Sequence, residues 1–147
     1  MKMRNLRLIS HRGNLNGPNP KLENSPEYVA IALELGFEVE IDVWFSKGQY
    51  FLGHDKPQFA IEEEFLQDER LWCHAKNLEA LEQMIENGGI HCFWHQSDRV
   101  TLTSQNIVWT FPGDEQIKES IMVLPEISMK ISEKSIGICS DFIQAYK

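Results

Sequence analysis

The sequence has few cysteines, few basic residues and no long apolar run. Its three cysteines, Cys73, Cys92 and Cys139, are an odd number without close pairing, which argues against a disulfide framework and favours a reducing compartment. No stretch approaches the ~18 consecutive apolar residues that suggest a membrane-spanning helix. The first ten residues, MKMRNLRLIS, are basic but lack the apolar centre of a signal peptide. We therefore expect a cytoplasmic protein without a membrane span.

Basic residues are also outnumbered by acidic ones. The chain has 14 Lys and Arg against 22 Asp and Glu, which gives a net charge of -8. Non-specific binding to nucleic acid requires an excess of positive charge, so we expect no nucleic-acid partner. A local positive pocket for one phosphate is compatible with this charge. The length of 147 residues predicts a single domain over residues 1–147, with a buried core but too short for a full eight-fold barrel.

Strand and helix signals alternate in the first half of the chain. Strands are expected at residues 7–10, 37–45 and 71–76. Two helices are also expected, the first capped by Ser25 and the second by Asn77. The expected apolar faces are Tyr28, Ile31, Ala32 and Leu35 in the first helix, and Leu78, Leu81 and Ile85 in the second. This alternation predicts parallel β–α units.

The second half contains short strand-like segments with little room for helices between them. These segments are residues 91–94, 107–111, 121–124 and 136–139. We therefore predict an α/β fold, a reduced or incomplete TIM-type (β/α) barrel that is thinned on one side. Such a barrel would leave sheet edges exposed, and a homodimer that covers them is one expectation.

Motifs that carry chemistry fall near the ends of the predicted strands. They are His11-Arg12-Gly13, Glu23-Asn24, the pair Glu40 and Asp42, and His54-Asp55. Parallel β–α folds place reactive groups at the carboxyl ends of their strands. We therefore expect these side chains to meet at one end of the barrel.

The two carboxylates point to the same face of one strand. Glu40 and Asp42 would lie about 6 to 7 Å apart along it, given a rise of ~3.3 Å per residue. Aligned carboxylates repel each other unless a proton or a cation lies between them, and a hard ion such as Mg²⁺ or Ca²⁺ is the expected solution. The alternative is a solvent-facing acidic row, which Glu38 would extend.

Basic side chains near these acids suit a phosphate ester. Arg12 can bind a phosphate through two hydrogen bonds. Lys76 lies on the same face of its strand as His74 and is a candidate for a second cation. His11 and His54 can share acid and base chemistry near neutral pH. For each of these side chains the alternative is a structural or solvent-exposed role.

As a set, these motifs resemble the glycerophosphodiester phosphodiesterases, a family of PLC-like phosphodiesterases. The runs ISHRGN and ENSPEYVAIALELGFEVEIDVWFSKGQYFLGHD are similar to the HRG, EN, ExD and HD pattern of that family over residues 7–55. The run CHAKN resembles it more faintly, and IVWTFPG and GICSDFI resemble its last strands loosely.

The resemblance implies a hydrolase that cleaves a small phosphodiester with the help of a divalent metal, Mg²⁺ or Ca²⁺, on a TIM-type barrel. By the same resemblance the metal would neutralise the phosphoryl oxygens. The implied roles are His11 and His54 as catalytic acid and base, Glu40 and Asp42 as metal ligands, Arg12 and Lys76 as phosphate ligands, and Glu23 as a group that orients a ligand or supports the metal.

The chain departs from the family pattern at the third metal ligand. The family has an acid two positions before Lys76, where this chain has His74. Imidazole is a poorer ligand than carboxylate for Mg²⁺ or Ca²⁺ and a better one for transition metals. Three alternatives are open: a different ion, a substitute acid such as Glu126, or weak binding. A zinc site that combines His74 with His95 is a further alternative.

The chain is also shorter than the family pattern after the HD motif. Only residues 56–70 precede the next predicted strand, where the family commonly has an insertion. Two hypotheses follow. The chain is either a metal-dependent phosphodiesterase that acts on a glycerophosphodiester or a similar small phosphodiester, or a catalytically degenerate barrel that binds a phosphorylated ligand or a protein partner.

Overall fold

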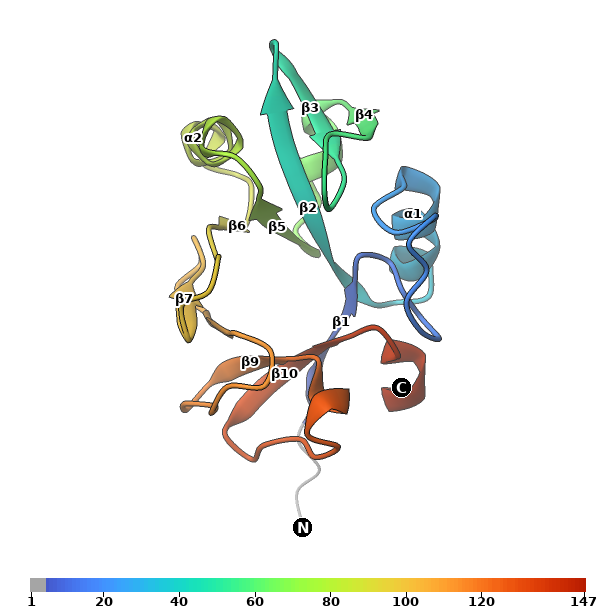
Figure 1. Ribbon diagram of the computed structural model, residues 1–147, viewed down its shortest axis with the longest axis vertical. Helices are drawn as coiled ribbons and strands as arrows, with labels where there is room; N and C mark the ends of the chain where they lie inside the picture. The colour runs from blue at the N-terminus through green and yellow to red at the C-terminus, as the bar shows by residue number, and fades with distance from the viewer. Residues whose placement is uncertain (1–4) are drawn as a thin grey trace.

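The computed structural model describes residues 5–147 as a curled mixed sheet with two α-helices (Figure 1). Residues 1–4, part of the basic segment considered for a signal peptide, lie outside the described residues. The strands are β1 (Arg7–His11), β2 (Glu38–Ser46), β3 (Gln49–Leu52), β4 (Phe59–Ile61), β5 (Leu71–Ala75), β6 (Cys92–Phe93), β7 (Val100–Leu102), β8 (Val108–Thr110), β9 (Ser120–Val123) and β10 (Ser135–Ser140). The helices are α1 (Pro26–Glu34), α2 (Leu78–Asn87) and the short 3₁₀ helices η1 (Glu63–Gln67), η2 (Pro125–Ile127) and η3 (Ile143–Tyr146).

Most of the sheet is a run of parallel strands. The order β6-β5-β2-β1-β10-β9-β8 is parallel throughout, and β7 pairs antiparallel with β8. The far end of β2 leaves this run and forms an antiparallel hairpin with β3, which pairs with β4. The sheet curls from β6 through β1 to β7 (Figure 1).

The two ends of the curl approach each other without forming a strand ladder among the described residues. Ser104 N donates to the carbonyl of Cys92 at 2.8 Å, and Thr101 Oγ1 donates to the carbonyl of Trp94 at 2.8 Å. The molecule is therefore a half-barrel dominated by its sheet.

The predicted TIM-type (β/α) barrel is wrong. Only the units β1-α1-β2 and β5-α2-β6 place an α-helix between parallel strands, and the described chain beyond α2 contains 3₁₀ turns instead of α-helices. Residues 111–119 connect β8 to β9, which is shorter than the dozen or more residues that a helical crossover requires. The second half can therefore add parallel strands but cannot cover them with helices.

The helices begin where their caps predict, but of the expected apolar faces only Ala32 is among the buried residues. Ser25 Oγ accepts from Tyr28 N at 3.3 Å, and Asn77 Oδ1 accepts from Ala80 N at 3.0 Å. The residues that α1 and α2 bury against the sheet are Val29, Ala32, Ala80 and Met84. The residues of the predicted apolar faces that remain exposed are Ile31, Leu35, Leu78 and Ile85.

Apolar side chains pack on both faces of the sheet. The convex face of β2 and β5 is covered by α1 and α2. The concave face holds a second cluster made of Ile9, Trp72, Phe93, Trp109, Ile121, Val123 and Cys139. Trp72 is the register partner of Glu40, so this cluster shares the concave face with the predicted metal ligands and forms the floor beneath them.

Neither described α-helix is long enough to cross a bilayer. The longer one, α2, has 10 residues and so spans about 15 Å, half of a ~30 Å hydrocarbon layer. The expectation of no membrane-spanning helix is confirmed for residues 5–147.

Candidate metal and phosphate site

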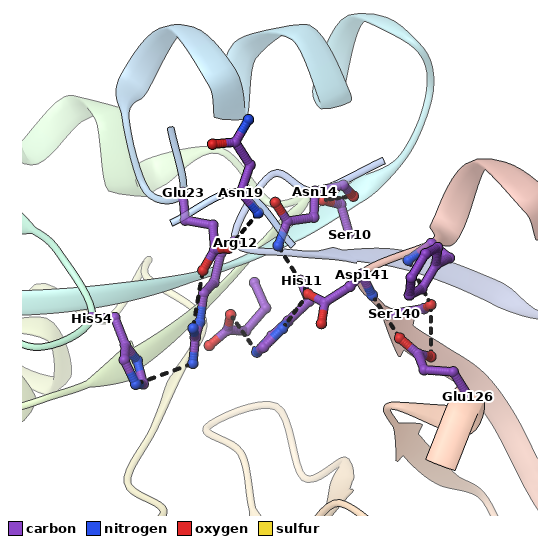
Figure 2. Close-up of polar contacts among 12 residues, drawn as sticks. Ser10, His11, Arg12, Asn14, Asn19, Glu23, His54, Glu126, Ser140 and Asp141 are labelled. Atoms are coloured by element: carbon purple, nitrogen blue, oxygen red, sulfur yellow. Dashed lines mark hydrogen bonds and ion pairs between the residues drawn. The ribbon is translucent and has the colours of Figure 1, made fainter. Parts of the chain in front are cut away.

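The carboxyl ends of neighbouring parallel strands bring charged side chains together on the concave face. In register, His11 of β1 lies beside Glu40 of β2, and Asp42 of β2 lies beside His74 of β5. Asp141 follows β10 directly and adds a carboxylate from the other side of β1. Figure 2 shows this meeting of the first and last parts of the chain, with His11 between Arg12 and Asp141.

Glu40, Asp42 and His74 form a compact cluster. One ligand atom from each lies within 4.8 Å of the others. His74 Nδ1 is 3.3 Å from Asp42 Oδ1 and 3.7 Å from Glu40 Oε2. The exposed fractions of Glu40 and Asp42 are only 3% and 1%, so the alternative of a solvent-facing acidic row is wrong for this pair.

Two oxygens of this cluster fit a cation. Glu40 Oε1 and Asp42 Oδ1 are buried and accept no hydrogen bond from any described residue. A buried charged oxygen without a donor is costly, and a divalent ion is a chemical group that such oxygens bind. The donor set of Glu40, Asp42 and His74 therefore fits a divalent metal.

Asp42 is the most connected of these acids. Its Oδ2 accepts from Asn24 Nδ2 at 3.0 Å and lies 3.3 Å from Arg12 Nε and 3.4 Å from His54 Nδ1. Burial opposes ionisation, but the close contacts with the His54 and His74 rings and the charge of Arg12 outweigh it and hold the pKa of Asp42 well below its ordinary value. Asp42 is therefore an anion across the neutral range.

His74 is fixed from its other side. Its Nε2 donates to the carbonyl of His95 at 2.8 Å, and its ring stacks on Phe93 with centroids 5.0 Å apart. Burial lowers the pKa of His74, but the carboxylates of Asp42 and Glu40 outweigh burial and raise the pKa to about 9. A proton on Nδ1 is thus one way to neutralise the two carboxylates, and a metal ion is the other.

His11 forms a dyad with Asp141 that sequence analysis missed. His11 Nδ1 lies 2.7 Å from Asp141 Oδ1, and His11 Nε2 is turned toward Glu40 Oε1 at 3.9 Å. Burial lowers the pKa of His11, but the hydrogen bond to Asp141 and the charge of Glu40 outweigh it and raise the pKa. The dyad therefore favours the protonated ring and directs its Nε2 into the site.

Asp141 is in turn held by residues at the end of β10 and after β1. It accepts from Asn14 Nδ2 at 2.9 Å, and its backbone N donates to Glu126 Oε2 at 3.1 Å. Glu126 also accepts from Ser140 Oγ at 2.8 Å. Glu126, considered as a substitute metal ligand, is engaged here instead, so it supports the dyad (Figure 2).

Gly13, the glycine of the HRG motif, also helps to hold Asp141 in place. Gly13 has φ +91°, and a Cβ there would lie 2.6 Å from Tyr28 Cδ2. The Tyr28 hydroxyl donates to Asn14 Oδ1 at 3.1 Å, and Asn14 bonds Asp141. The close packing that glycine permits therefore connects α1 to the dyad.

Arg12 lies between the metal cluster and His54. Its Nη1 donates to Glu23 Oε1 at 3.1 Å, and its Nη2 lies 3.3 Å from His54 Nε2 (Figure 2). Glu23 also accepts from Asn19 N at 2.7 Å, so its role is to orient Arg12. A guanidinium only donates, so His54 Nε2 can only accept in this contact.

Lys76 is the one predicted site residue outside this network. It follows β5 at the same end of the sheet, where its backbone N donates to the carbonyl of Val43 at 2.8 Å. Its side chain is half-buried, and no hydrogen bond or ion pair joins it to any described residue. The other predicted residues lie in one continuous network of polar contacts.

No protein-family model, no curated protein and no solved structure matches the chain significantly. The resemblance to the glycerophosphodiester phosphodiesterases therefore rests on the sequence motifs alone.

Proposed function

We propose that the chain is a metal-dependent hydrolase that cleaves a glycerophosphodiester or a similar small phosphodiester. The observation that carries this proposal is the buried pair Glu40 and Asp42, whose two oxygens lack donors, next to two histidines and an arginine at the carboxyl ends of the strands. A cation at the acids and a guanidinium beside them suit the two negative oxygens of a bridging phosphate.

The binding of substrate would involve the cation and Arg12. A divalent ion held by Glu40, Asp42 and His74 supplies positive charge that neutralises the phosphoryl oxygens. Arg12 Nη2 meets His54 in an exposed contact, which a phosphate oxygen can replace, while Glu23 keeps the guanidinium in place. The phosphate would then contact the cation and Arg12 Nη2.

The two histidines would divide the proton transfers. Asp141 and Glu40 raise the pKa of His11 and so favour its protonated form, whose Nε2 would donate a proton to the leaving alcohol. His54 accepts at Nε2 and is partly open to solvent, with 42% of its side chain exposed. It can therefore take the proton from an attacking water or substrate hydroxyl.

The proposal is tested by hydrolysis of bis(p-nitrophenyl) phosphate and of a panel of glycerophosphodiesters, with Mn²⁺, Mg²⁺ or Ca²⁺ or with a chelator. We expect turnover that requires the ion and that falls about 10²- to 10⁴-fold in His11→Ala. His95→Gln is the matched control, because the His95 ring bonds the carbonyl of Asp98 instead of the site. A folded, metal-loaded protein that cleaves none of these esters would contradict the proposal and favour a phosphate-binding role.

A further inference from the structure

We propose that the centre of Glu40, Asp42 and His74 selects a first-row transition dication, such as Mn²⁺, Co²⁺ or Zn²⁺, over Mg²⁺ and Ca²⁺, with His74 Nδ1 as a ligand. This inference rests on the metal site of the proposed function, but it does not depend on phosphodiester cleavage. It replaces the Mg²⁺ or Ca²⁺ that the sequence motifs imply.

The first support is the orientation of the His74 ring. The carbonyl of His95 can only accept, so His74 Nε2 carries a proton. Once the ring is neutral, the lone pair is therefore on Nδ1, the nitrogen that faces Asp42 Oδ1 and Glu40 Oε2. Metal-binding histidines are commonly fixed in this way, with the second nitrogen bonded to a carbonyl or carboxylate.

The rigidity of the ring adds to this support. The His74 and Phe93 rings stack with an interplanar angle of 8°, and Phe93 is itself buried in the floor beneath the site. The stacking fixes the plane of the ring, and a half-turn within that plane, which would take Nδ1 away from the acids, would break the bond to His95. The imidazole therefore stays directed at the position that a metal would occupy.

The second support is the composition of the donor set. Glu40 and Asp42 are almost fully buried, and each has one oxygen, Glu40 Oε1 and Asp42 Oδ1, that accepts no hydrogen bond from the described residues. Asp42 Oδ1 and Glu40 Oε2 face His74 Nδ1 at 3.3 and 3.7 Å, so the three side chains offer two oxygens and one nitrogen. Ca²⁺ takes six to eight oxygens and Mg²⁺ a near-octahedral oxygen shell, whereas imidazole nitrogen favours transition dications.

The other acids near the site are engaged elsewhere. Glu23 bonds Arg12 and the backbone of Asn19. Asp141 bonds His11, and Glu126 bonds the end of β10. Within residues 5–147, the side chains that lie close enough together to hold a metal ion are Glu40, Asp42 and His74. No additional carboxylate is therefore free to turn the site into an all-oxygen one.

The experiment measures metal affinity and metal–nitrogen contact separately from activity. Chelator-treated protein is titrated by calorimetry with Mn²⁺, Co²⁺, Zn²⁺, Mg²⁺ and Ca²⁺, and the Mn²⁺ form is studied by pulsed EPR for coupling to ¹⁴N. The variants are His74→Glu, which replaces the nitrogen by oxygen, and His95→Gln, which keeps the backbone carbonyl that His74 bonds. His74→Ala is included in case His74→Glu does not fold.

We expect wild type and His95→Gln to bind Mn²⁺ about tenfold or more tighter than Mg²⁺ or Ca²⁺, with ¹⁴N coupling. His74→Glu should reduce the preference for Mn²⁺ over Mg²⁺ and Ca²⁺ about tenfold, and His74→Ala should weaken Mn²⁺ binding by a similar factor. Both variants should lose the ¹⁴N coupling. Equal affinities for Mn²⁺ and Mg²⁺ without ¹⁴N coupling in the wild type would overturn the inference, as would the absence of cation binding.

The two proposals fail in different ways. Mn²⁺ binding with ¹⁴N coupling but without cleavage of any phosphodiester would leave the metal inference standing and refute the proposed function. Cleavage that Mg²⁺ supports fully, without ¹⁴N coupling to bound Mn²⁺, would leave the proposed function standing and refute the metal inference.

Discussion

At the scale of single residues, the contact between His11 and Asp141 joins positions that are 130 residues apart in the sequence. Asp141 accepts from His11 Nδ1 and Asn14 Nδ2, and its own backbone N is held by Glu126. These contacts leave only His11 Nε2 facing the acids of β2. Asp141 is therefore a positioning residue, which also determines how strongly His11 holds its proton.

The substitution Asp141→Asn tests this role through the pH profile. An amide removes the negative charge that helps to raise the pKa of His11. If His11 donates a proton in the reaction, the rate falls as the pH rises through this pKa. We therefore expect the high-pH limb of kcat/KM to move to lower pH in the variant, with kcat reduced about 10- to 10³-fold. An unchanged limb would show that His11 is not the acid that Asp141 supports.

Sequence analysis predicted most of this site because its residues lie in short motifs between residues 11 and 76. Asp141 was missed as the partner of His11, and Glu126 was considered only as a metal ligand, because β1 pairs with β10 only in the folded chain. The signal that could have found Asp141 is the Ser140-Asp141 pair that follows the last predicted strand, as the other motifs follow theirs. Lys76 was predicted from strand alternation, which indicates the face of the strand on which a side chain lies but not which residue it contacts.

At the scale of secondary-structure elements, Asn77 connects α2 to the end of β2. Its Oδ1 accepts from Ala80 N and from Phe45 N, and its Nδ2 donates to the carbonyl of Phe45 at 2.9 Å. A side chain that caps a helix and completes the bonding of a strand fixes both elements beside β5. The position of His74 at the end of β5 depends on this packing.

Asn77→Ala should therefore lower the free energy of unfolding by more than the removal of an ordinary helix cap does. We expect a loss of about 2 kcal/mol in the free energy of unfolding, because a helix cap and two strand contacts are removed together. Urea denaturation followed by circular dichroism measures it. Glu82→Ala, at an exposed position of α2, is the matched control and should change stability by less than about 0.5 kcal/mol. Equal values for the two variants would contradict this account of Asn77.

The starts of the helices were predictable, whereas their buried faces were not. Ser25 and Asn77 act through local hydrogen bonds that short-range sequence determines. α1 is apolar on nearly all sides (PEYVAIALE), so the pattern cannot decide which side meets the sheet. The side that packs contains the small residue Ala32, and α2 likewise packs through Ala80. The same sides also bury Val29 and Met84, whereas Ile31 and Leu78 stay exposed.

At the scale of the whole molecule, aromatic packing joins the two halves of the open barrel. Trp109 of β8 lies 5.4 Å from Trp72 of β5 and 4.9 Å from Phe93 of β6, measured between ring centroids. No ladder joins these edges of the sheet within the described residues. The aromatic floor therefore provides the connection across the concave face that a closed barrel would obtain from hydrogen bonds.

Trp109→Ala should destabilise the protein by about 3 to 5 kcal/mol, the range for removing a large buried aromatic side chain. Chemical denaturation measures the free energy, and the Mn²⁺ affinity of the folded variant shows whether the floor also supports the site. A loss below about 1 kcal/mol, within the range of ordinary point mutations, would show that the concave face does not depend on this contact.

The overall architecture was the least predictable level. The parallel strands of the first half and their helices follow from local signals, and the family resemblance extended that alternation to a reduced or incomplete TIM-type (β/α) barrel. Residues 88–147 form strands as expected but have connections too short for helices. The hairpin of β3 and β4 and the edge strand β7 add antiparallel pairs that such a barrel lacks.

The most direct test of the central claim is ³¹P NMR of a glycerophosphodiester mixed with Mn²⁺-loaded wild type or Asp42→Asn. Asp42 joins the metal cluster to Arg12 and His54, and the amide keeps its shape while removing its charge. We predict conversion of the diester to a phosphomonoester by the wild type and its loss in the variant, with unchanged circular dichroism. Equal conversion by both proteins, or none by the folded and metal-loaded wild type, would contradict the assignment of this site as a metal-dependent phosphodiesterase.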